Sequence, residues 1–228
     1  MQIAGLQKLT LLDFPGYTAC TVFTGGCNFR CPFCHNAGIV LSPTGNYSTQ
    51  QIIDFLSTRH GKLDGVCITG GEPLLNDGIA DFIAQIKSMG FLVKLDTNGS
   101  RYEKLKLLIE SGVVDYVAMD IKNVPEKYSL STGVKCNINE VLSSVELLKK
   151  GICDYEFRTT VVKQFNEVED FKQIAEWLKG AKRYFLQQFN DSGNILRSGC
   201  SAYSEEEMRN ILSVVKQNGL EVAQLRGV

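Results

Sequence analysis

The sequence is low in proline and in net charge, and it has no long apolar run. Its 228 residues include 5 prolines, with 44% hydrophobic and 21% charged side chains. These proportions exclude disordered, collagen-like and coiled-coil proteins. Lysine and arginine number 24 against 25 acidic residues, for a formal net charge of −1. No overall field favours nucleic acid or an anionic membrane surface, and we expect neither as a partner.

Signals for export and membrane insertion are also lacking. No apolar stretch reaches the ~18 to 20 residues of a membrane span, and the opening MQIAGLQKLTLLDFPG lacks the apolar centre of a signal peptide. We therefore expect a cytoplasmic protein. Its eight cysteines are too sparse for a disulfide scaffold, and in this compartment a tight cysteine cluster is more often metal-binding or catalytic.

Helical and strand-like patterns alternate from about residue 48 to the end of the chain. Capping boxes at Ser48 and Ser204 predict the first and last of six helices. The other four are expected after Asn76, near 101–111, near 138–150 and after Asn166. A glycine follows each helical pattern: Gly61, Gly90, Gly112, Gly151, Gly180 and Gly219. Seven strand-like runs accompany the helices: 18–24, 65–70, 91–97, 113–121, 155–162, 183–189 and 220–225.

This alternation predicts a single α/β domain over residues 1–228, with a parallel sheet and helices outside it. A partial (β/α) barrel and a doubly wound open sheet are both compatible with it. The barrel is favoured because polar residues end nearly every strand, as they do at the active-site face of barrels. These ends are 69–72, 96–99, 120–122, 158–160 and 187–190. With fewer than eight βα units, the barrel should be incomplete and leave a lateral gap.

Three cysteines lie close together in the segment TGGCNFRCPFCHN. Cys27, Cys31 and Cys34 have the spacing C-x3-C-x2-C, and three thiolates on a four-iron cluster would leave one iron open to an exogenous ligand. Structural zinc needs a fourth ligand, for which His35 is badly placed beside Cys34. Covalent haem on 31–35 (CPFCH) would leave Cys27 unexplained. Burial of the cysteines as small hydrophobes is the remaining alternative, and the iron-sulfur cluster is favoured.

This spacing, with the aromatic Phe33 just before the last cysteine, resembles the signature of radical S-adenosylmethionine (SAM) enzymes. Residues 70–73 (GGEP) resemble the GGE motif of that superfamily, and 96–99 (DTNG) and 120–122 (DIK) resemble the next strand-end motifs of its activating-enzyme branch. The resemblance covers nearly the whole chain. It implies a TIM-type partial barrel of six units, (β/α)6, with parallel strands and outer helices.

The resemblance also implies cofactors and a site. Cys27, Cys31 and Cys34 would hold one [4Fe-4S] cluster, because the other cysteines are scattered. SAM would bind the fourth iron beside the residues that match the family's site: Phe33, Gly70, Gly71, Glu72, Asp96, Asn98 and Lys122. In related activases a monovalent cation lies at the positions of Asp96, Thr97 and Asp120.

Roles for single residues follow from the same resemblance. Gly70 and Gly71 would let the backbone approach the methionine part of SAM, and Glu72 would accept from its ammonium group. Phe33 would lie against the adenine. Lys122 would face the carboxylate or ribose, and Asn98 would contact the ribose.

Two further motifs resemble one branch, the glycyl-radical-enzyme activases: 13–16 (DFPG) and 34–36 (CHN). The opening segment is most similar to the activating proteins of anaerobic ribonucleoside-triphosphate reductase. This implies an oxidoreductase that cleaves SAM reductively to a 5′-deoxyadenosyl radical and generates a glycyl radical on that partner, with an electron donor such as flavodoxin or ferredoxin. Alternatives are another glycyl-radical enzyme, a small-molecule or peptide substrate, or a non-enzymatic zinc-binding protein. The segment 9–14 and the loop 123–136 are candidate docking surfaces for the partner.

Overall fold

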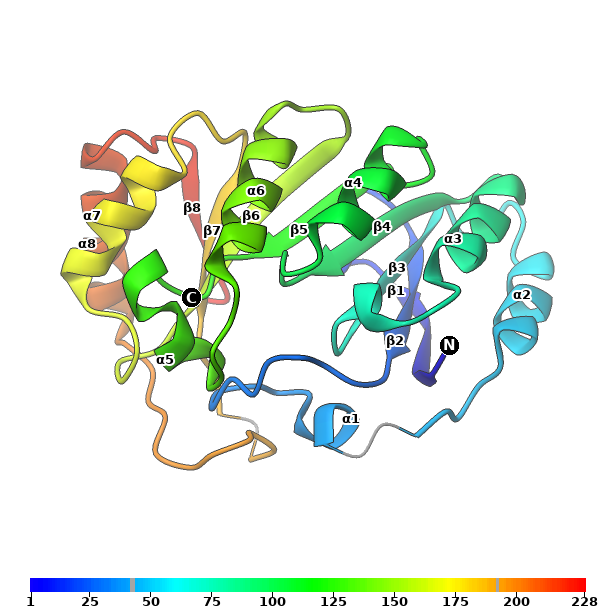
Figure 1. Ribbon diagram of the computed structural model, residues 1–228, viewed down its shortest axis with the longest axis horizontal. Coiled ribbons are helices and arrows are strands. Elements are labelled where there is room, and N and C mark those ends of the chain that lie inside the picture. The colour runs from blue at the N-terminus through cyan, green and yellow to red at the C-terminus, as the bar shows by residue number, and fades with distance from the viewer. Residues whose placement is uncertain (42–43, 192) are drawn as a thin grey trace.

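The computed structural model describes residues 1–41, 44–191 and 193–228. Eight strands form one sheet in chain order (Figure 1): β1 (Ile3–Thr10), β2 (Ala19–Thr24), β3 (Gly65–Gly70), β4 (Leu92–Thr97), β5 (Tyr116–Asp120), β6 (Asp154–Val161), β7 (Tyr184–Gln188) and β8 (Ala223–Arg226). β2 to β8 pair in parallel, and β1 is antiparallel to β2. The outer strands β1 and β8 do not pair within the described residues, so the sheet is not closed.

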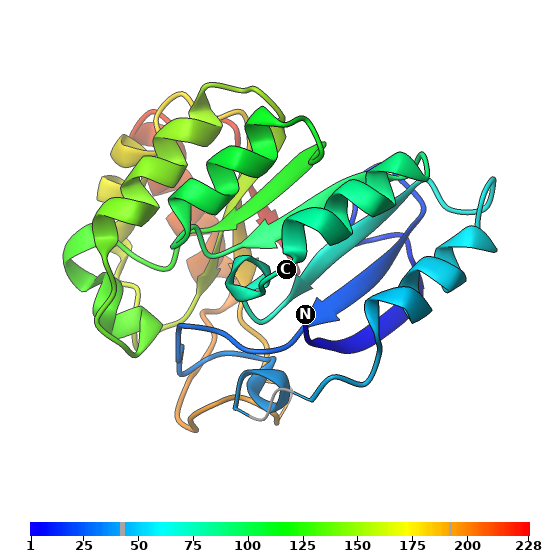
Figure 2. The same ribbon diagram turned by 45° about the vertical axis from the view of Figure 1, so that its right-hand side comes forward.

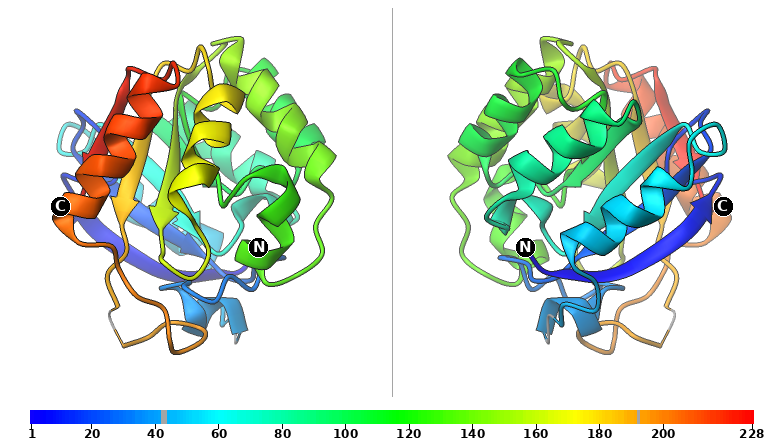
Figure 3. Two further views of the ribbon diagram at one scale, coloured as in Figure 1. Left: turned by 90° about the vertical axis from the view of Figure 1, so that its left-hand side faces the viewer. Right: turned by 90° about the vertical axis from the view of Figure 1, so that its right-hand side faces the viewer.

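Helices cover the outer face of the curved sheet (Figures 1 and 3). The described residues form α1 (Ala37–Leu41), α2 (Thr49–Ser57), α3 (Ile79–Ser88), α4 (Tyr102–Glu110), α5 (Tyr128–Thr132), α6 (Ile138–Lys149), α7 (Val168–Trp177) and α8 (Glu205–Gln217), with short 3-10 turns at Pro73–Leu75 and Pro125–Lys127. The short α1 lies away from that face, below the carboxyl ends of the strands in Figure 1. The two predicted capping boxes are confirmed, since Ser48 and Ser204 each accept from the backbone of the third helical residue. The six predicted helices are α2, α3, α4, α6, α7 and α8.

Four of these helices end where the glycine pattern predicts. Gly90, Gly112, Gly151 and Gly219 directly follow the last capping residue and have positive φ. α2 and α7 end earlier, at Ser57 and Trp177, and the chain makes a further turn before its glycine. Among the described residues, no helix has both the length and the apolar content to cross a bilayer.

The strand β1 is absent from the sequence-based prediction. Its burial does not alternate along the strand, because the pairing with β2 shifts register between Ile3 and Gly5 and again between Gln7 and Thr10. Such irregularities change which face a side chain occupies, and they remove the period of two that reveals a strand. The strand therefore adds an antiparallel edge to the seven predicted parallel strands.

The inner face of the sheet is polar at its carboxyl end. Because side chains alternate along a strand, Ile68, Leu95 and Met119 pack outward into the core beneath the helices. Their polar neighbours line a cavity on the inner face: Thr69, Asp96, Asp120, Arg158 and Thr160. Charged side chains thus gather at the carboxyl ends of the strands, and the cysteine-bearing loop lies at the same end.

The loop between β1 and β2 closes the opposite end of this interior. Phe14 is 1% exposed and packs in a separate cluster with Ala19, Tyr116 and Ala118. Asp13 lines the cavity and accepts a hydrogen bond from Thr21 (2.5 Å). The DFPG segment therefore plugs the amino-terminal end of the sheet.

Candidate active site

The three clustered cysteines line one cavity of 490 Å³ at the carboxyl end of the strands. They lie on residues 25–36, the cluster loop, which follows β2. Arg30 holds this loop closed, because its guanidinium donates to the carbonyls of Cys27 (2.5 Å) and Phe29 (2.8 Å). The loop also rests on the C-terminal end of α5, where the amide of Arg30 donates to the Thr132 carbonyl (2.8 Å).

Burial raises the pKa of Cys27 to about 11 and that of Cys31 to about 12. Both groups are therefore neutral thiols at pH 7 until a metal displaces their protons. Among the described residues, no three Cys, His, Asp or Glu side chains converge as ligands of a single metal ion.

Gly70 and Gly71 let the cluster loop pack directly onto the end of β3. A Cβ on Gly71 would lie 1.8 Å from the carbonyl oxygen of Gly26, and one on Gly70 would lie 2.5 Å from that of Thr24. Two backbone bonds join the same segments, from Gly71 N to Thr24 O and from Glu72 N to Gly26 O (both 2.8 Å). Both glycines line the cavity, and their missing side chains make room for the protein's own backbone.

Glu72 lies behind the cavity wall and is 1% exposed. Its carboxylate accepts from the backbone of Leu74 (3.1 Å), the hydroxyl of Thr97 (2.9 Å) and the backbone of Asn98 (2.7 Å). Burial outweighs these bonds and raises its pKa to about 7. The structure thus places Glu72 as a link between the ends of β3 and β4; a contact with SAM stays a prediction.

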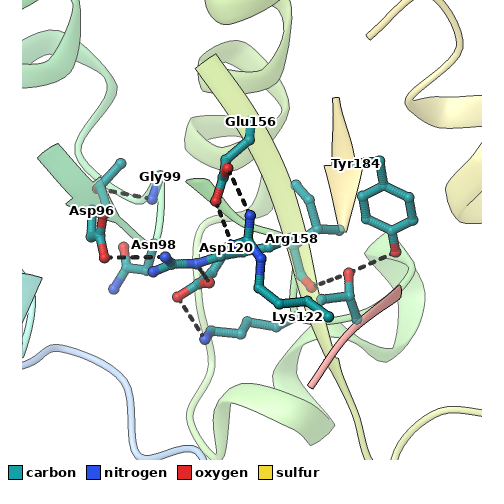
Figure 4. Close-up of polar contacts among 12 residues, drawn as sticks. Asp96, Asn98, Gly99, Asp120, Lys122, Glu156, Arg158 and Tyr184 are labelled. Atoms are coloured by element: carbon teal, nitrogen blue, oxygen red, sulfur yellow. Dashed lines mark hydrogen bonds and ion pairs between the residues drawn. The ribbon is translucent and has the colours of Figure 1, made fainter. Parts of the chain in front are cut away.

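Asp96 and Asp120 are joined by a guanidinium (Figure 4). Arg158 donates to Asp120 from Nε (2.6 Å) and to Asp96 from Nη1 (3.1 Å). Lys122 bonds Asp120 (3.0 Å), and Lys94 bonds Asp96. Burial opposes ionisation of both carboxyls, but the neighbouring cations outweigh it and hold both pKa values below their usual range.

The predicted cation ligands therefore face different partners. Arg158 lies between Asp96 and Asp120, and the Thr97 hydroxyl donates to Glu72. Two carboxylates and three cationic groups make up the network of Lys94, Asp96, Asp120, Lys122 and Arg158. Of these cations, Lys122 and Arg158 border the cavity beside the carboxylates of Asp13, Asp96 and Asp120, and a fixed cation on this wall suits an anionic group.

Sequence reasoning missed Lys94, and it named Arg158 only among the polar strand ends (158–160) and not among the site residues. The sequence does indicate where Lys94 lies, because it comes two residues before Asp96 on β4 and hence on the same face of the sheet. Arg158 lies at the polar end of β6, directly opposite Asp120 in the strand pairing. Aligning the carboxyl ends of the neighbouring parallel strands would therefore have placed both side chains in the predicted site.

Phe33 and Lys122 border the cavity as predicted site residues. Phe33 is 3% exposed and packs at a tilt against Phe165, with ring centroids 5.5 Å apart. The Nζ of Lys122 lies 6.0 Å from the Phe33 ring centroid. A cation and an apolar ring thus lie side by side on one wall.

The two candidate docking surfaces differ in position. Leu9 near the end of β1 is 57% exposed, and Leu11 and Leu12 in the β1–β2 connection are 70% and 89% exposed. All three lie at the end of the sheet opposite to the cluster loop. The loop 123–136 supports the cluster loop, since a Cβ on Gly133 would lie 2.2 Å from the Arg30 carbonyl oxygen. A third segment, residues 193–203, crosses beside the cluster loop (Figure 2), where Arg197 N donates to Pro32 O (3.0 Å).

A family model supplies the assignment that this geometry suggests. Residues 21–178 match the model of the radical SAM superfamily. The chain belongs to this superfamily. Radical SAM enzymes use a [4Fe-4S] cluster and SAM. Three thiols that line one cavity fit such a cluster.

Known relatives define the branch of the radical SAM superfamily. A Methanocaldococcus jannaschii protein named "putative glycyl-radical enzyme activating enzyme" is 34% identical over 96% of this chain and 88% of its own. The pyruvate formate-lyase-activating enzyme of Listeria monocytogenes is 33% identical over 56% of both chains. The chain thus belongs to the radical SAM enzymes of the glycyl-radical-enzyme activating branch.

A solved radical SAM structure supports the fold. The crystal structure of Streptococcus suis SuiB bound to S-adenosylmethionine superposes with a TM-score of 0.72 at 12% identity, covering 90% of this chain and 49% of SuiB. At this identity the likeness shows the fold alone. The prediction of an α/β partial barrel with parallel strands and outer helices is confirmed.

Proposed function

We propose that this protein cleaves SAM reductively and generates a glycyl radical on a partner enzyme, and that the partner is anaerobic ribonucleoside-triphosphate reductase. The observation that carries the proposal is the meeting of Cys27, Cys31 and Cys34 with the polar strand ends in one cavity. When bound, the cluster and SAM supply the electron and the 5′-deoxyadenosyl radical. The chain's own residues bind, orient and shield them.

Three groups of residues have separate tasks in this proposal. The cysteines hold the cluster, and the Lys122–Asp120 pair presents a fixed cation to an anionic group of SAM. Phe33 offers a buried ring to the adenine. Gly70 and Gly71 keep the cluster loop against β3, which sets the distance between the cysteines and the strand ends.

The open sheet suits a protein substrate. Because β1 and β8 do not pair in the described part of the chain, the interior is not sealed by a ring of strands, and a glycine-bearing segment of another protein can reach the cavity. The M. jannaschii relative, which this chain covers over 88% of its length, bears a name of the same function. The choice of the reductase rests on the resemblance of the opening segment.

We further propose one domain over residues 1–228, a cytoplasmic location and flavodoxin or ferredoxin as electron donor.

The partner can be tested directly. Protein reconstituted anaerobically with iron and sulfide is reduced with SAM in the presence of anaerobic ribonucleoside-triphosphate reductase or, in parallel, pyruvate formate-lyase. We expect the doublet signal of a glycyl radical with the reductase and not with the lyase, and no signal with Cys31→Ala. A signal only with the lyase would move the assignment to another glycyl-radical enzyme. SAM cleavage with neither signal would favour a small-molecule or peptide substrate.

A further inference from the structure

The side-chain amide of Asn98 is fully hydrogen-bonded to the chain itself. Its Oδ1 accepts from the backbone N (3.0 Å) and the hydroxyl (2.6 Å) of Ser100. Its Nδ2 donates to Oδ1 of Asn28 (3.0 Å) and contacts Sγ of Cys27 (3.9 Å). An asparagine amide offers two donors and two acceptor positions. All four are in use, which leaves none for the ribose of SAM.

The orientation of this amide is fixed. The backbone N–H of Ser100 can only donate, so the group that faces it must be the oxygen of Asn98, and the NH₂ group must face the cluster loop. The backbone of Asn98 is held in turn, since its N–H donates to Glu72 (2.7 Å). Asn28 donates to the Ser100 hydroxyl (2.8 Å) and closes the ring of contacts.

Cys27 differs from the other two cysteines in its surroundings. Its sulfur accepts from the backbone N of Phe29 (3.4 Å) and from Asn98 (3.9 Å). Within the described ranges, the sulfurs of Cys31 and Cys34 accept no hydrogen bond from an N–H group. Hydrogen bonds to cluster sulfurs stabilise the more negative, reduced state and so raise the reduction potential.

We propose that Asn98 is a positioning residue of the cluster: its amide fixes the cluster loop at Cys27 and Asn28 and donates to the Cys27 sulfur, which raises the reduction potential. The inference rests on the cluster of the proposed function. It relates the strand-end motif 96–99 to the metal centre rather than to the ribose. Glu72 contributes by holding the backbone from which the amide projects.

The test measures the reduction potential of the reconstituted cluster in Asn98→Ala, by titration followed by electron paramagnetic resonance. Asn36→Ala is the matched control, because Asn36 lines the same cavity but its side-chain amide donates to the Gly70 carbonyl (2.7 Å) rather than to a cysteine sulfur. We expect a more negative potential in Asn98→Ala and an unchanged one in Asn36→Ala. The affinity of the loaded protein for SAM should stay within about threefold of wild type, since no donor or acceptor for SAM is lost.

A second pair of variants covers the case in which Asn98→Ala does not hold a cluster. Asn98→Asp keeps the size and the bonds from Ser100 but replaces the donor by an anion, and Asn36→Asp adds the same charge to the same cavity. The potential should fall further in Asn98→Asp than in Asn36→Asp. The inference would be overturned if the cluster had the same reduction potential in both members of each pair, Asn98→Ala with Asn36→Ala and Asn98→Asp with Asn36→Asp. A loss of SAM affinity above about tenfold in Asn98→Ala would also overturn it. Wild-type protein that assembles no cluster would overturn the proposed function as well.

Discussion

Gly71 is the residue at which the cluster loop and the sheet come closest. Its missing side chain leaves room for the Gly26 carbonyl, which a Cβ would meet at 1.8 Å. Real Cβ atoms do not approach backbone this closely, so the loop must move to admit any side chain. The position of Cys27, one residue after Gly26, depends on this contact.

We predict that Gly71→Ala loses most of its capacity to bind iron. The displaced loop carries Cys27 away from Cys31 and Cys34, and three ligands are then no longer available to one cluster. Iron and sulfide content after anaerobic reconstitution measures the effect. Gly38→Ala is the control, because a Cβ on Gly38 meets nothing within 4 Å. Full iron content in Gly71→Ala would show that the close approach is not required.

The raised pKa of Glu72 predicts that the stability of the protein depends on pH. Its pKa is raised to about 7 in the folded protein, whereas an unfolded glutamate titrates near 4.3. Between these values the folded state binds more protons, so the free energy of unfolding falls as the pH rises through this window, by about 3 kcal/mol in total. At pH 7 about half of the folded Glu72 is still protonated, so the loss continues and ends about one pH unit higher.

Glu72→Gln removes this titration. Urea unfolding at intervals from pH 4.5 to 7.5 should therefore show the stability of wild type falling relative to Glu72→Gln by about 3 kcal/mol as the pH rises. A constant difference between the two proteins would mean that Glu72 is ionised throughout. The comparison cancels the contributions of other titrating groups, which both proteins share.

Sequence reasoning could name the residues at the strand ends but not their partners. Asp96 and Lys122 are recognisable because they follow apolar strands. The bonds from Arg158 to two carboxylates, and from Glu72 to Thr97 and Asn98, depend on how the ends of separate strands converge. No local pattern encodes that convergence, and this is why the roles of Glu72 and Asn98 emerge only from the structure.

At the scale of elements, helices are the most predictable part of this fold. α8 has both a capping box and a regular apolar face of Met208, Ile211 and Val215. The strand β1 has neither signal, because two register shifts interrupt its alternation. The parallel strands are recognisable as short apolar runs between helices, as expected for strands buried on both faces.

The loop between β1 and β2 has a packing role that its sequence did not reveal. Phe14 is buried against Ala19, Tyr116 and Ala118, so Phe14→Ala should lower the free energy of unfolding by about 3–5 kcal/mol. Leu12→Ala in the same loop should change it by less than about 0.5 kcal/mol, since Leu12 is 89% exposed. Urea unfolding of both variants measures the difference. Equal small losses would show that the plug does not support the fold.

At the scale of the whole molecule, the two ends of the sheet have different tasks, one in function and one in stability. The cavity brings together the cluster loop and the ends of β3 to β7, which are far apart in the sequence. The opposite end carries the Phe14 plug and the exposed leucines of the β1–β2 loop. The parallel order of the strands produces this division, because parallel strands place all their carboxyl ends on one side.

The formation of 5′-deoxyadenosine from SAM tests the central claim most directly. The protein is reconstituted anaerobically, reduced with SAM and analysed by chromatography, beside Cys31→Ala and the control Cys153→Ala, whose cysteine does not line the cavity. We predict 5′-deoxyadenosine from wild type and Cys153→Ala and none from Cys31→Ala. Wild-type protein that binds no iron and forms no 5′-deoxyadenosine would contradict the account.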